Sequence, residues 1–266
     1  MKLFWSLLLV AGALFAYDDS DWDGVEDSMD NCPYTPMEAF VDAQGCDNQL
    51  HSSASLGYTY SSGDFGTTTT YLTHAMLLGA TLQFHTTTLT LNTSYLYSGA
   101  LIPQTADLND TQAGLGDLYV TVGENFFLNS DTTLTLQLNG KLPTANATLG
   151  SGIADIGGTL LLAVAHDAFS GYVLGSYTHV GDSSSVNYND IFASGIGVGY
   201  NYGAWYVGAN YYLATPYFDT EPSIQRATFG LYYYASQGTN VALSYAMGLT
   251  DATAKESYTL SIGHAF

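Results

Sequence analysis

Six residues near the start of the chain have the types and spacing of a calcium-binding loop. In a loop of about twelve residues, alternating oxygen ligands surround the ion and a glycine near the middle makes the sharp turn. The ligand positions fall here on Asp19, Asp21, Asp23, Val25, Asp27 and Asp30, with Gly24 at the turn and Val25 offering its backbone carbonyl. Because a hard cation accepts oxygen atoms in irregular arrangements, the sequence predicts Ca²⁺ as a bound cofactor. The alternative is an acidic linker without an ion.

Two cysteines follow this loop. Cys32 and Cys46 are the only cysteines of the protein, and an even number in an exported chain predicts a disulfide. Closing a loop of about fifteen residues restricts the unfolded chain by ~3 kcal/mol in the entropic account. An oxidising compartment such as the bacterial periplasm would maintain this bond.

The same stretch resembles a thrombospondin type 3 repeat of the bacterial sort. The resemblance rests on Asp19-Ser-Asp-Trp-Asp-Gly-Val-Glu-Asp-Ser-Met-Asp-Asn-Cys-Pro, and it continues through Thr35-Pro36 and Val41-Asp42 to Gly45-Cys46. Trp22 stands where glycine or another small residue is usual in such repeats. The resemblance implies a calcium-bound spacer, which is an appendage and not the whole protein.

The first residues have the character of a secretory signal peptide. Lys2 precedes an apolar run from Leu3 to Val10, and small residues follow it. We expect cleavage after Ala16. The domains expected are therefore a signal peptide (1–16), a calcium-binding module (17–50) and a second domain (51–266).

The composition excludes several classes of protein. Of 266 residues 47% are hydrophobic, whereas 24 acidic and 4 basic residues make up only 11%, against about 25% charged residues in soluble domains. A net charge of −20 repels nucleic acid, whose phosphates require clustered Lys and Arg. After the first segment no apolar run approaches the ~20 residues of a membrane helix. A soluble all-β protein or a transmembrane β-barrel remains.

From residue 51 onward, aromatic and aliphatic residues alternate with Thr, Ser and Gly, as in antiparallel strands. The pattern predicts twelve strands, near 52–61, 70–84, 87–98, 112–128, 132–141, 154–166, 169–180, 190–201, 204–215, 223–236, 240–249 and 255–266.

The connections between these strands differ in length by parity. Those after even strands are short, such as His85-Thr86 and Tyr202-Gly203, whereas those after odd strands are mostly longer, such as 99–111 and 181–189. Outer-membrane barrels have short periplasmic turns and longer external loops. We therefore expect an all-β fold, a transmembrane antiparallel β-barrel in the outer membrane of a Gram-negative bacterium, with the calcium-binding module in the periplasm.

The two faces of the predicted strands differ in polarity. In 112–128 the even positions are mostly apolar, while the odd positions include Asp117, Tyr119 and Thr121. One face therefore suits lipid and the other water. Glu124 breaks the pattern, so it must lie near the periplasmic interface or in a bulge.

The end of the chain resembles the C-terminal assembly signal of outer-membrane barrels. It presents Tyr258, Leu260, Ile262 and Phe266 on one face and finishes with an aromatic residue. It departs at His264, where an aromatic residue is usual. The resemblance implies membrane lipid and the barrel assembly machinery as partners.

A second resemblance covers the middle of the barrel. The segments Gly114-Leu-Gly-Asp-Leu118, Gly140-Lys-Leu-Pro-Thr144 and Leu149-Gly-Ser-Gly-Ile-Ala-Asp155 are similar to those of the transporter barrels grouped with the MetA-type protein of phenol-degradation pathways. Ala145 stands where glycine often follows the Pro-Thr pair. The family implies passage of small, often hydrophobic or aromatic, compounds across the outer membrane.

Independently of that resemblance, several polar residues are expected to point into the lumen. A turn centred near Ser130 places Tyr119 opposite Lys141, with Asp117 on the diagonal. The lumen candidates are Asp117, Tyr119, Lys141, Asp155 and Arg226. A cluster of Asp117, Lys141 and Asp155 would form a constriction that selects permeants. The alternative is a structural salt bridge that braces the wall.

Three classes of function follow from these patterns. A porin-like channel or transporter for a small-molecule permeant is favoured, and a structural or adhesive surface barrel comes second. An outer-membrane hydrolase is third, because no histidine lies in a recognisable catalytic motif. We expect no enzymatic activity, no catalytic residues and no partner among nucleic acids.

Overall fold

The chain divides into two units, Met1–Leu50 and His51–Phe266. The computed structural model describes residues 25, 27–32, 44–46, 50–102, 107–145, 149–150, 152–182, 187–236 and 238–266. The predicted signal peptide lies outside these residues. No helix among the described residues has the length and apolar character needed to cross a membrane.

In the N-terminal unit the predicted disulfide between Cys32 and Cys46 is formed. Next to it, the backbone N–H of Asn31 donates to the carbonyl of Gln44 at 2.8 Å. The two segments that carry the cysteines are thus tied together by a covalent bond and a hydrogen bond.

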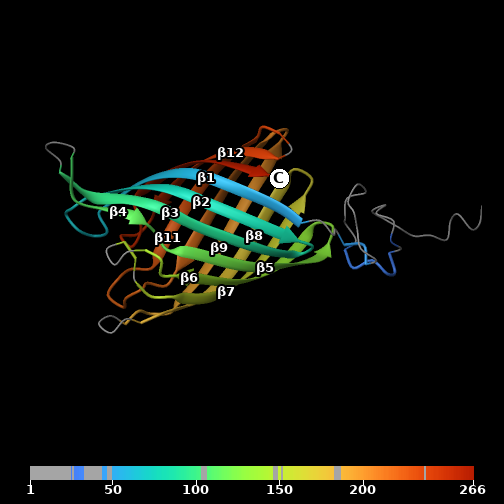
Figure 1. Ribbon diagram of the computed structural model, residues 1–266, viewed down its shortest axis with the longest axis horizontal. Helices are drawn as coiled ribbons and strands as arrows, with labels where there is room; N and C mark the ends of the chain where they lie inside the picture. The colour runs from blue at the N-terminus through green and yellow to red at the C-terminus, as the bar shows by residue number, and fades with distance from the viewer. Residues whose placement is uncertain are drawn as a thin grey trace, which may run out of the picture. The chain divides into compact units, whose positions relative to one another are not determined.

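The second unit is a single antiparallel sheet (Figure 1). Its strands are β1 (Leu50–Gly63), β2 (Tyr71–Phe84), β3 (Thr87–Ile102), β4 (Asp107–Leu115), β5 (Leu118–Asn129), β6 (Thr132–Leu142), β7 (Asp155–His166), β8 (Phe169–Val180), β9 (Ile191–Tyr202), β10 (Trp205–Ala214), β11 (Ile224–Tyr234), β12 (Thr239–Gly248) and β13 (Glu256–Ala265).

The sheet closes into a barrel because β1 pairs with both β2 and β13. Strands β4 and β5 pair with successive parts of β3, so together they occupy one strand position in the wall. Thirteen strands therefore fill twelve strand positions around the barrel. The predicted all-β barrel with twelve strand positions is confirmed.

The connections have the predicted parity. Turns of two to four residues follow β2, β5, β7, β9 and β11, and the connections at the other end are longer, except for the four-residue connection between β3 and β4. We call these the short-turn end and the long-loop end of the barrel.

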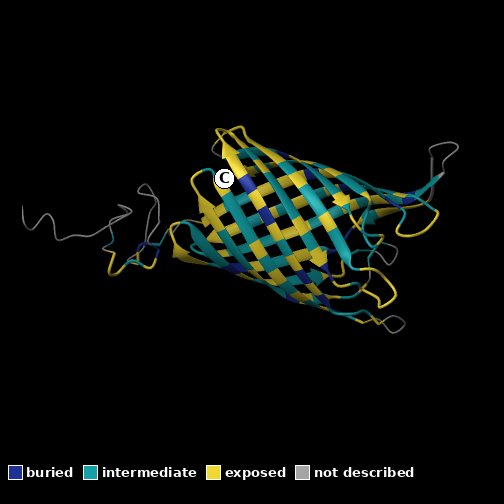
Figure 2. Ribbon diagram, turned by 180° about the vertical axis from the view of Figure 1, so that it is seen from behind, coloured by how far each residue is buried: buried dark blue, intermediate teal, exposed yellow. Residues whose placement is uncertain are grey.

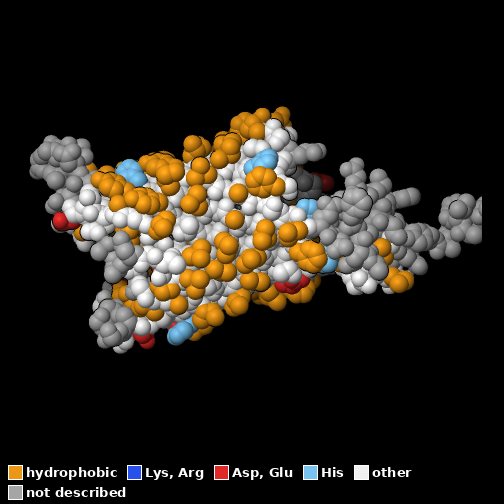
Figure 3. Space-filling view, in the orientation of Figure 1, with side chains coloured by type: hydrophobic (Ala, Val, Ile, Leu, Met, Phe, Trp, Pro, Cys, Tyr) orange, Lys and Arg blue, Asp and Glu red, His pale blue; other side chains and the backbone are white. Residues whose placement is uncertain are grey.

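Burial alternates along the strands, which gives the chequered pattern of Figure 2. On β6, Leu136 and Leu138 are 46% and 58% exposed on the outside. Thr135 on the inner face of the same strand is buried. Hydrophobic side chains accordingly spread over the outer face in Figure 3. Among the residues that the structure describes, few hydrophobic side chains are buried, because apolar side chains point outward.

The inner face is held by polar contacts between strands. Asn139 on β6 accepts a hydrogen bond from the hydroxyl of Thr121 on β5 (3.0 Å) and donates one to Thr159 on β7 (2.9 Å). Such cross-strand hydrogen bonds satisfy polar groups on the side of a sheet that faces water.

Two details of the predicted strands are wrong. The expected loop 99–111 is largely a hairpin, because β3 continues to Ile102 and β4 begins at Asp107. The expected strand 112–128 is interrupted at Gly116 and Asp117, where the register with β3 shifts by one residue between β4 and β5. Alternation does not reveal the hairpin, since a hairpin that extends beyond an apolar band needs no apolar face.

Glu124 points to the outer face close to the short-turn end, opposite Thr87, the first residue of β3. Its carboxylate accepts hydrogen bonds from the hydroxyls of Thr86 and Thr87. The break in alternation therefore lies at the rim of the barrel, next to a turn.

Candidate functional site: the lumen at the long-loop end

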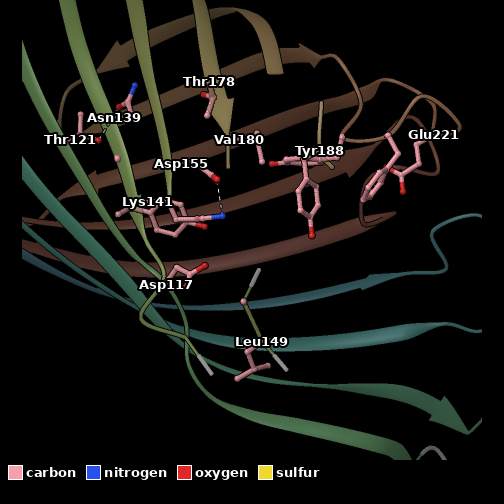
Figure 4. Close-up of a pocket in the computed structure, with 15 residues that line it drawn as sticks. Asp117, Thr121, Asn139, Lys141, Leu149, Asp155, Thr178, Val180, Tyr188 and Glu221 are labelled. Carbon is pink, nitrogen blue, oxygen red and sulfur yellow. Dashed lines mark hydrogen bonds and ion pairs between the residues drawn. The ribbon is translucent and has the colours of Figure 1, made fainter. Parts of the chain in front are cut away.

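A cavity of about 690 Å³ occupies the lumen near the long-loop end. Strands β5 to β8 supply one part of its lining, and loops supply the rest (Figure 4). Four of the five predicted lumen residues line it: Asp117, Tyr119, Lys141 and Asp155. The alternation of the strands accounts for this, because these residues share the inward face.

Lys141 and Asp155 form an ion pair across β6 and β7. They are direct partners in the strand register, and Nζ of Lys141 lies 2.6 Å from Oδ2 of Asp155. Their side chains are only 12% and 14% exposed. Tyr119 on β5 is the strand partner of Lys141 on its other side, so Lys141 has an aromatic neighbour in one strand and an acidic neighbour in the other.

Asp117 occupies the interruption between β4 and β5 and is buried. Its Oδ1 accepts a hydrogen bond from the backbone N–H of Ala145 at 3.0 Å. The hydroxyl of Thr144 donates to the carbonyl of the preceding residue, Gly116, at 3.1 Å. Asp117 thus holds the loop after β6 against the wall.

The three segments on which the predicted resemblance to the MetA-type barrels rests meet at this point. Gly116 and Asp117 belong to the first, Thr144 adjoins Ala145 at the end of the second, and Gly150 belongs to the third. A β-carbon at Gly150 would lie 3.0 Å from Oδ1 of Asp117. These residues, far apart in the sequence, together build one corner of the mouth.

Two loops contribute aromatic side chains to the other side of the cavity. The loop after β8 supplies Tyr188 and the loop after β10 supplies Tyr217 and Phe218. Tyr188 and Phe218 have ring centroids 5.2 Å apart, and the N–H of Asn189 donates to the carbonyl of Tyr217 at 2.9 Å. The two loops are therefore fastened to each other above the lumen.

Below these loops lies a small apolar cluster on the inner face. Val180, Ile191, Ala193 and Ala214 are its buried members, and Tyr188 packs against them. Burial also raises the pKa of Tyr217, with a further contribution from the charge of Asp155. Tyr217 therefore keeps its proton at neutral pH and acts as a neutral hydrogen-bonding group in the mouth.

Arg226, the fifth predicted lumen residue, lines a second cavity of about 520 Å³. Its guanidinium carbon lies 5.8 Å from the centroid of the Tyr212 ring, within the range of a cation–π contact. Tyr217 borders both cavities. Arg226 thus lies in a different cavity from the Lys141–Asp155 pair, and Tyr217 lies at the border between the two cavities.

The contacts of His166 do not support a hydrolase of the serine type. Its Nδ1 lies 2.6 Å from Oδ2 of Asp131, and the hydroxyl of Ser130 donates to the same carboxylate at 2.9 Å. In a catalytic triad the histidine lies between the serine and the acid, so that it can accept the serine proton. Here the acid lies in the middle.

The terminal strand presents Tyr258, Leu260 and Ile262 on the outer face, each more than two-fifths exposed. Phe266 follows them, and its N–H donates to the carbonyl of Ser52 at 2.8 Å. The end of the chain is therefore paired with β1 at the point where the barrel closes.

The predicted calcium ligands are only partly within the described residues. Asp19, Asp21 and Asp23 lie outside them, whereas Val25, Asp27 and Asp30 lie inside. The N–H of Cys32 donates to Oδ1 of Asp30 at 2.7 Å. Among the residues that the structure describes, no cluster of three acidic, His or Cys side chains suited to a metal ion is found.

Apart from Tyr119, the aromatic residues of the lumen are not among those predicted from the sequence. Tyr212 shares the inward parity of Arg226, so alternation alone could have indicated it. Tyr217, Tyr188 and Phe218 lie in loops, where alternation carries no information.

Comparison with known proteins gives separate results for the two units. Residues 17–39 match the family model of the thrombospondin type 3 repeat. No curated protein matches the chain significantly.

Solved structures resemble the barrel. The chain is similar to KdgM porin with a TM-score of 0.53 and 10% identity, over 80% of this chain and 99% of that one. It is similar to NanC porin with a TM-score of 0.54 and 10% identity, over 79% and 98%. The fold is that of a porin-type membrane barrel.

A further similar structure is KdgM porin in complex with disordered oligogalacturonate, with a TM-score of 0.51 and 10% identity, over 80% of this chain and 99% of that one. At such identities the likeness concerns the fold alone. Membership of the MetA-type family stays a prediction.

Proposed function

We propose that the barrel is a channel for small solutes in the outer membrane of a Gram-negative bacterium. The observation that carries the proposal is the closed wall with apolar side chains outside and polar side chains inside. A closed wall of this kind pairs its backbone N–H and C=O groups without an open edge and encloses a water-filled path through lipid. The likeness to porins supports the same function.

The mouth described above would be the selective part of this channel. It offers an ion pair, Lys141–Asp155, and the hydroxyl of Tyr217 to a solute that enters. The resemblance to the MetA-type barrels adds hydrophobic or aromatic compounds to the permeants that we consider. Selection would then depend on size and on contact with aromatic rings.

For the N-terminal unit we propose a calcium-binding spacer in the periplasm. The donor set suits the ion, because Asp19, Asp21, Asp23, Asp27 and Asp30 supply carboxylate oxygens and Val25 a carbonyl oxygen. The hydrogen bond from Cys32 to Asp30 orients one of these carboxylates. Bound calcium would reduce the repulsion within an acidic segment that contains no Lys or Arg.

We further propose that Tyr258, Leu260, Ile262 and Phe266 act as the signal for the barrel assembly machinery. Their outward direction and the position of Phe266 beside β1 support this role. Membrane lipid would cover the same residues after insertion.

Single-channel recording in planar lipid bilayers tests the channel function. Protein that is folded in detergent, as judged by altered gel mobility before boiling, should produce discrete conductance steps. Folded protein without conductance would contradict the channel and favour a structural or adhesive barrel. Turnover of phospholipid by the folded protein would favour the hydrolase.

A further inference from the structure

We propose that Tyr172, Tyr206 and Tyr232 form an aromatic binding surface in the short-turn half of the lumen, and that this surface binds the rings of neutral saccharides. The proposal rests on the channel function and adds a class of permeant to it. It concerns a part of the lumen distinct from the mouth.

The direction of the three side chains follows from strand parity. Tyr172 shares the face of Thr178 and Val180, which line the first cavity. Tyr206 shares the face of Tyr212, and Tyr232 that of Arg226; both of these line the second cavity. All three tyrosines therefore point into the lumen, closer to the short turns than the mouth residues are.

Strand β9 provides the floor on which two of the rings lie. Its inward positions Gly195, Gly197 and Gly199 have no side chains. A β-carbon at Gly197 would come within 2.3 Å of the ring of Tyr172, and one at Gly199 within 2.1 Å of the hydroxyl of Tyr206. The rings thus occupy the space that side chains of β9 would fill.

The two rings reach this floor from opposite sides. Tyr172 comes from β8 and Tyr206 from β10, the two neighbours of β9. The hydroxyl of Tyr206 reaches across to within 3.4 Å of Oγ of Ser170 on β8. Because Gly197 and Gly199 are alternate residues, the two places where these side chains meet β9 lie about 7 Å apart along the strand.

Tyr232 extends this surface onto β11. It is the strand partner of Tyr206, and the ring centroids are 5.6 Å apart with an interplanar angle of 69°. Tyr232 is 36% exposed. A ring that is backed by glycine backbone has one face covered and offers the other to a solute in the lumen.

The wall across the lumen has a different chemistry. In a closed barrel with twelve strand positions, β9 lies opposite β2 and its neighbours β1 and β3. Hydroxyls line this side: those of Thr81 and Thr90 are 3.2 Å apart, and, nearer the long-loop end, those of Thr59 and Thr259 are 2.7 Å apart. Since a hydroxyl has one donor and two acceptor sites, each pair retains the capacity to bind a further group.

A saccharide ring suits both walls. Its axial C–H groups form an apolar face that stacks on tyrosine, and its equatorial hydroxyls can exchange hydrogen bonds with threonine hydroxyls. A hydrophobic aromatic solute would use the tyrosines alone and would leave the hydroxylated wall without a partner.

The charges of the lumen favour a neutral saccharide over an acidic one. The chain has four basic residues, Lys2, Lys141, Arg226 and Lys255. Lys141 is paired with Asp155, Lys255 with Asp64 outside the strands, and Arg226 lies over Tyr212. No row of cations follows the aromatic surface in the described residues, so a polyanion would find little compensation there.

Single-channel recording with added saccharide tests the proposal. Maltohexaose should interrupt the potassium chloride current of the native protein, and hexagalacturonate of the same length should interrupt it less. The variants Tyr172→Leu, Tyr206→Leu and Tyr232→Leu should each shorten the maltohexaose interruptions about threefold to tenfold, because each removes one aromatic face. Tyr206→Phe should keep them, since it retains the ring.

Tyr233→Leu is the matched control. Tyr233 is the neighbour of Tyr232 but faces outward, where its ring lies 4.6 Å from that of Trp205. This variant should leave the interruptions unchanged. If one leucine variant fails to fold, the other two carry the comparison.

Four results would overturn the proposal. An open channel whose current maltohexaose does not interrupt would refute saccharide binding while leaving the channel function intact. Equal interruption times in native protein and all three leucine variants would refute the role of the tyrosines. Interruptions by phenol that depend on the tyrosines, without any by maltohexaose, would assign the surface to aromatic solutes. Absence of any conductance would remove the channel function itself, and the proposal with it.

Discussion

The backbone of Gly150 lies directly against the carboxylate of Asp117. A β-carbon at Gly150 would be 3.0 Å from one carboxylate oxygen and 3.1 Å from the other, and 2.7 Å from the β-carbon of Ala145. Asp117 also accepts the N–H of Ala145. The loop after β6 is thus fixed to the wall by a close fit as well as by a hydrogen bond.

Gly150→Ala should therefore destabilise the barrel. The added methyl group must displace either the buried carboxylate or the loop, and overpacking of this kind costs about 1–3 kcal/mol. Urea unfolding in lipid vesicles, followed by tryptophan fluorescence, measures the effect. Gly140→Ala is the control, because its β-carbon would meet only the carbonyl of Val120 at 3.9 Å; an equal loss in both variants would contradict the argument.

Lys141→Ala should make the channel more selective for cations. From residue 51 onward the chain has 14 acidic and 3 basic residues, a formal charge of 3 − 14 = −11, and a narrow pore focuses such a field. Removal of the ammonium group leaves Asp155 without its partner. Reversal potentials in a salt gradient measure the change, which should be larger at low ionic strength because screening acts over ~10 Å at 0.1 M salt.

Lys255→Ala is the matched control for this prediction. It removes the same charge, but Lys255 pairs with Asp64 in the loops and is 62% exposed. Its effect on selectivity should be smaller. Anion selectivity of the native protein would contradict the charge argument, and unchanged selectivity in Lys141→Ala would assign the ion pair to bracing of the wall.

The N-terminal unit should bind Ca²⁺ in preference to Mg²⁺, because the larger ion accepts more oxygens in less regular positions. Calorimetry on the folded full-length protein measures the binding. Asp21→Ala and Asp23→Ala should each weaken it, since each removes a ligand. Asp167→Ala serves as control, as its side chain is 87% exposed on a short turn of the barrel. Unaltered calcium binding in both loop variants would refute the ligand assignment.

Acid should weaken the barrel through Asp190, which precedes β9. Hydrogen bonds from the hydroxyl of Tyr177 (2.5 Å) and from His179 (2.8 Å) hold the pKa of Asp190 below its usual value of 3.8. A lowered pKa in the folded state means that this contribution is present above 3.8 and is lost as the pH falls through the folded pKa.

Thermal unfolding of native protein and Asp190→Asn over a range of pH tests this sign. The variant should unfold at a lower temperature at pH 7, and the difference should shrink only below a pH of about 3.8. The effect should be small, because the group is exposed. A difference that grows toward acid pH would disprove the assignment.

Most of the wall could be predicted because lipid imposes alternation. Residues that face the apolar band are mostly apolar, so strand positions and inward residues such as Lys141 and Asp155 follow from parity. The interruption at Gly116 and Asp117 could not be predicted in this way. It depends on the contact of Asp117 with Ala145, which belongs to a loop that is remote in sequence.

The group of tyrosines on one side of the lumen could not be predicted from the sequence either. Tyr206 and Tyr172 have inward parity, but their importance becomes visible only with the glycines of β9 beneath them. Tyr217 depends on a contact between two loops. Such features arise from pairs of segments, and a single strand pattern does not contain them.

The glycines of β9 also bear on how the wall is aligned during assembly. Each inward glycine of this strand seats a different side chain: Gly195 lies against Leu174, Gly197 against Tyr172 and Gly199 against Tyr206. A slip of β8 by two residues would keep every side chain on its proper face. It would, however, bring Tyr172 against Tyr206 at Gly199 or move Leu174 from Gly195 to Ala193, so packing on the glycines opposes it. Hydrogen bonds oppose the same slip at the other end of the hairpin, where Asp190 accepts from the hydroxyl of Tyr177 and from the N–H of Val180 and lies beside His179. One carboxylate at the long-loop end and the packing on the glycines would thus together fix the register of β8 against β9.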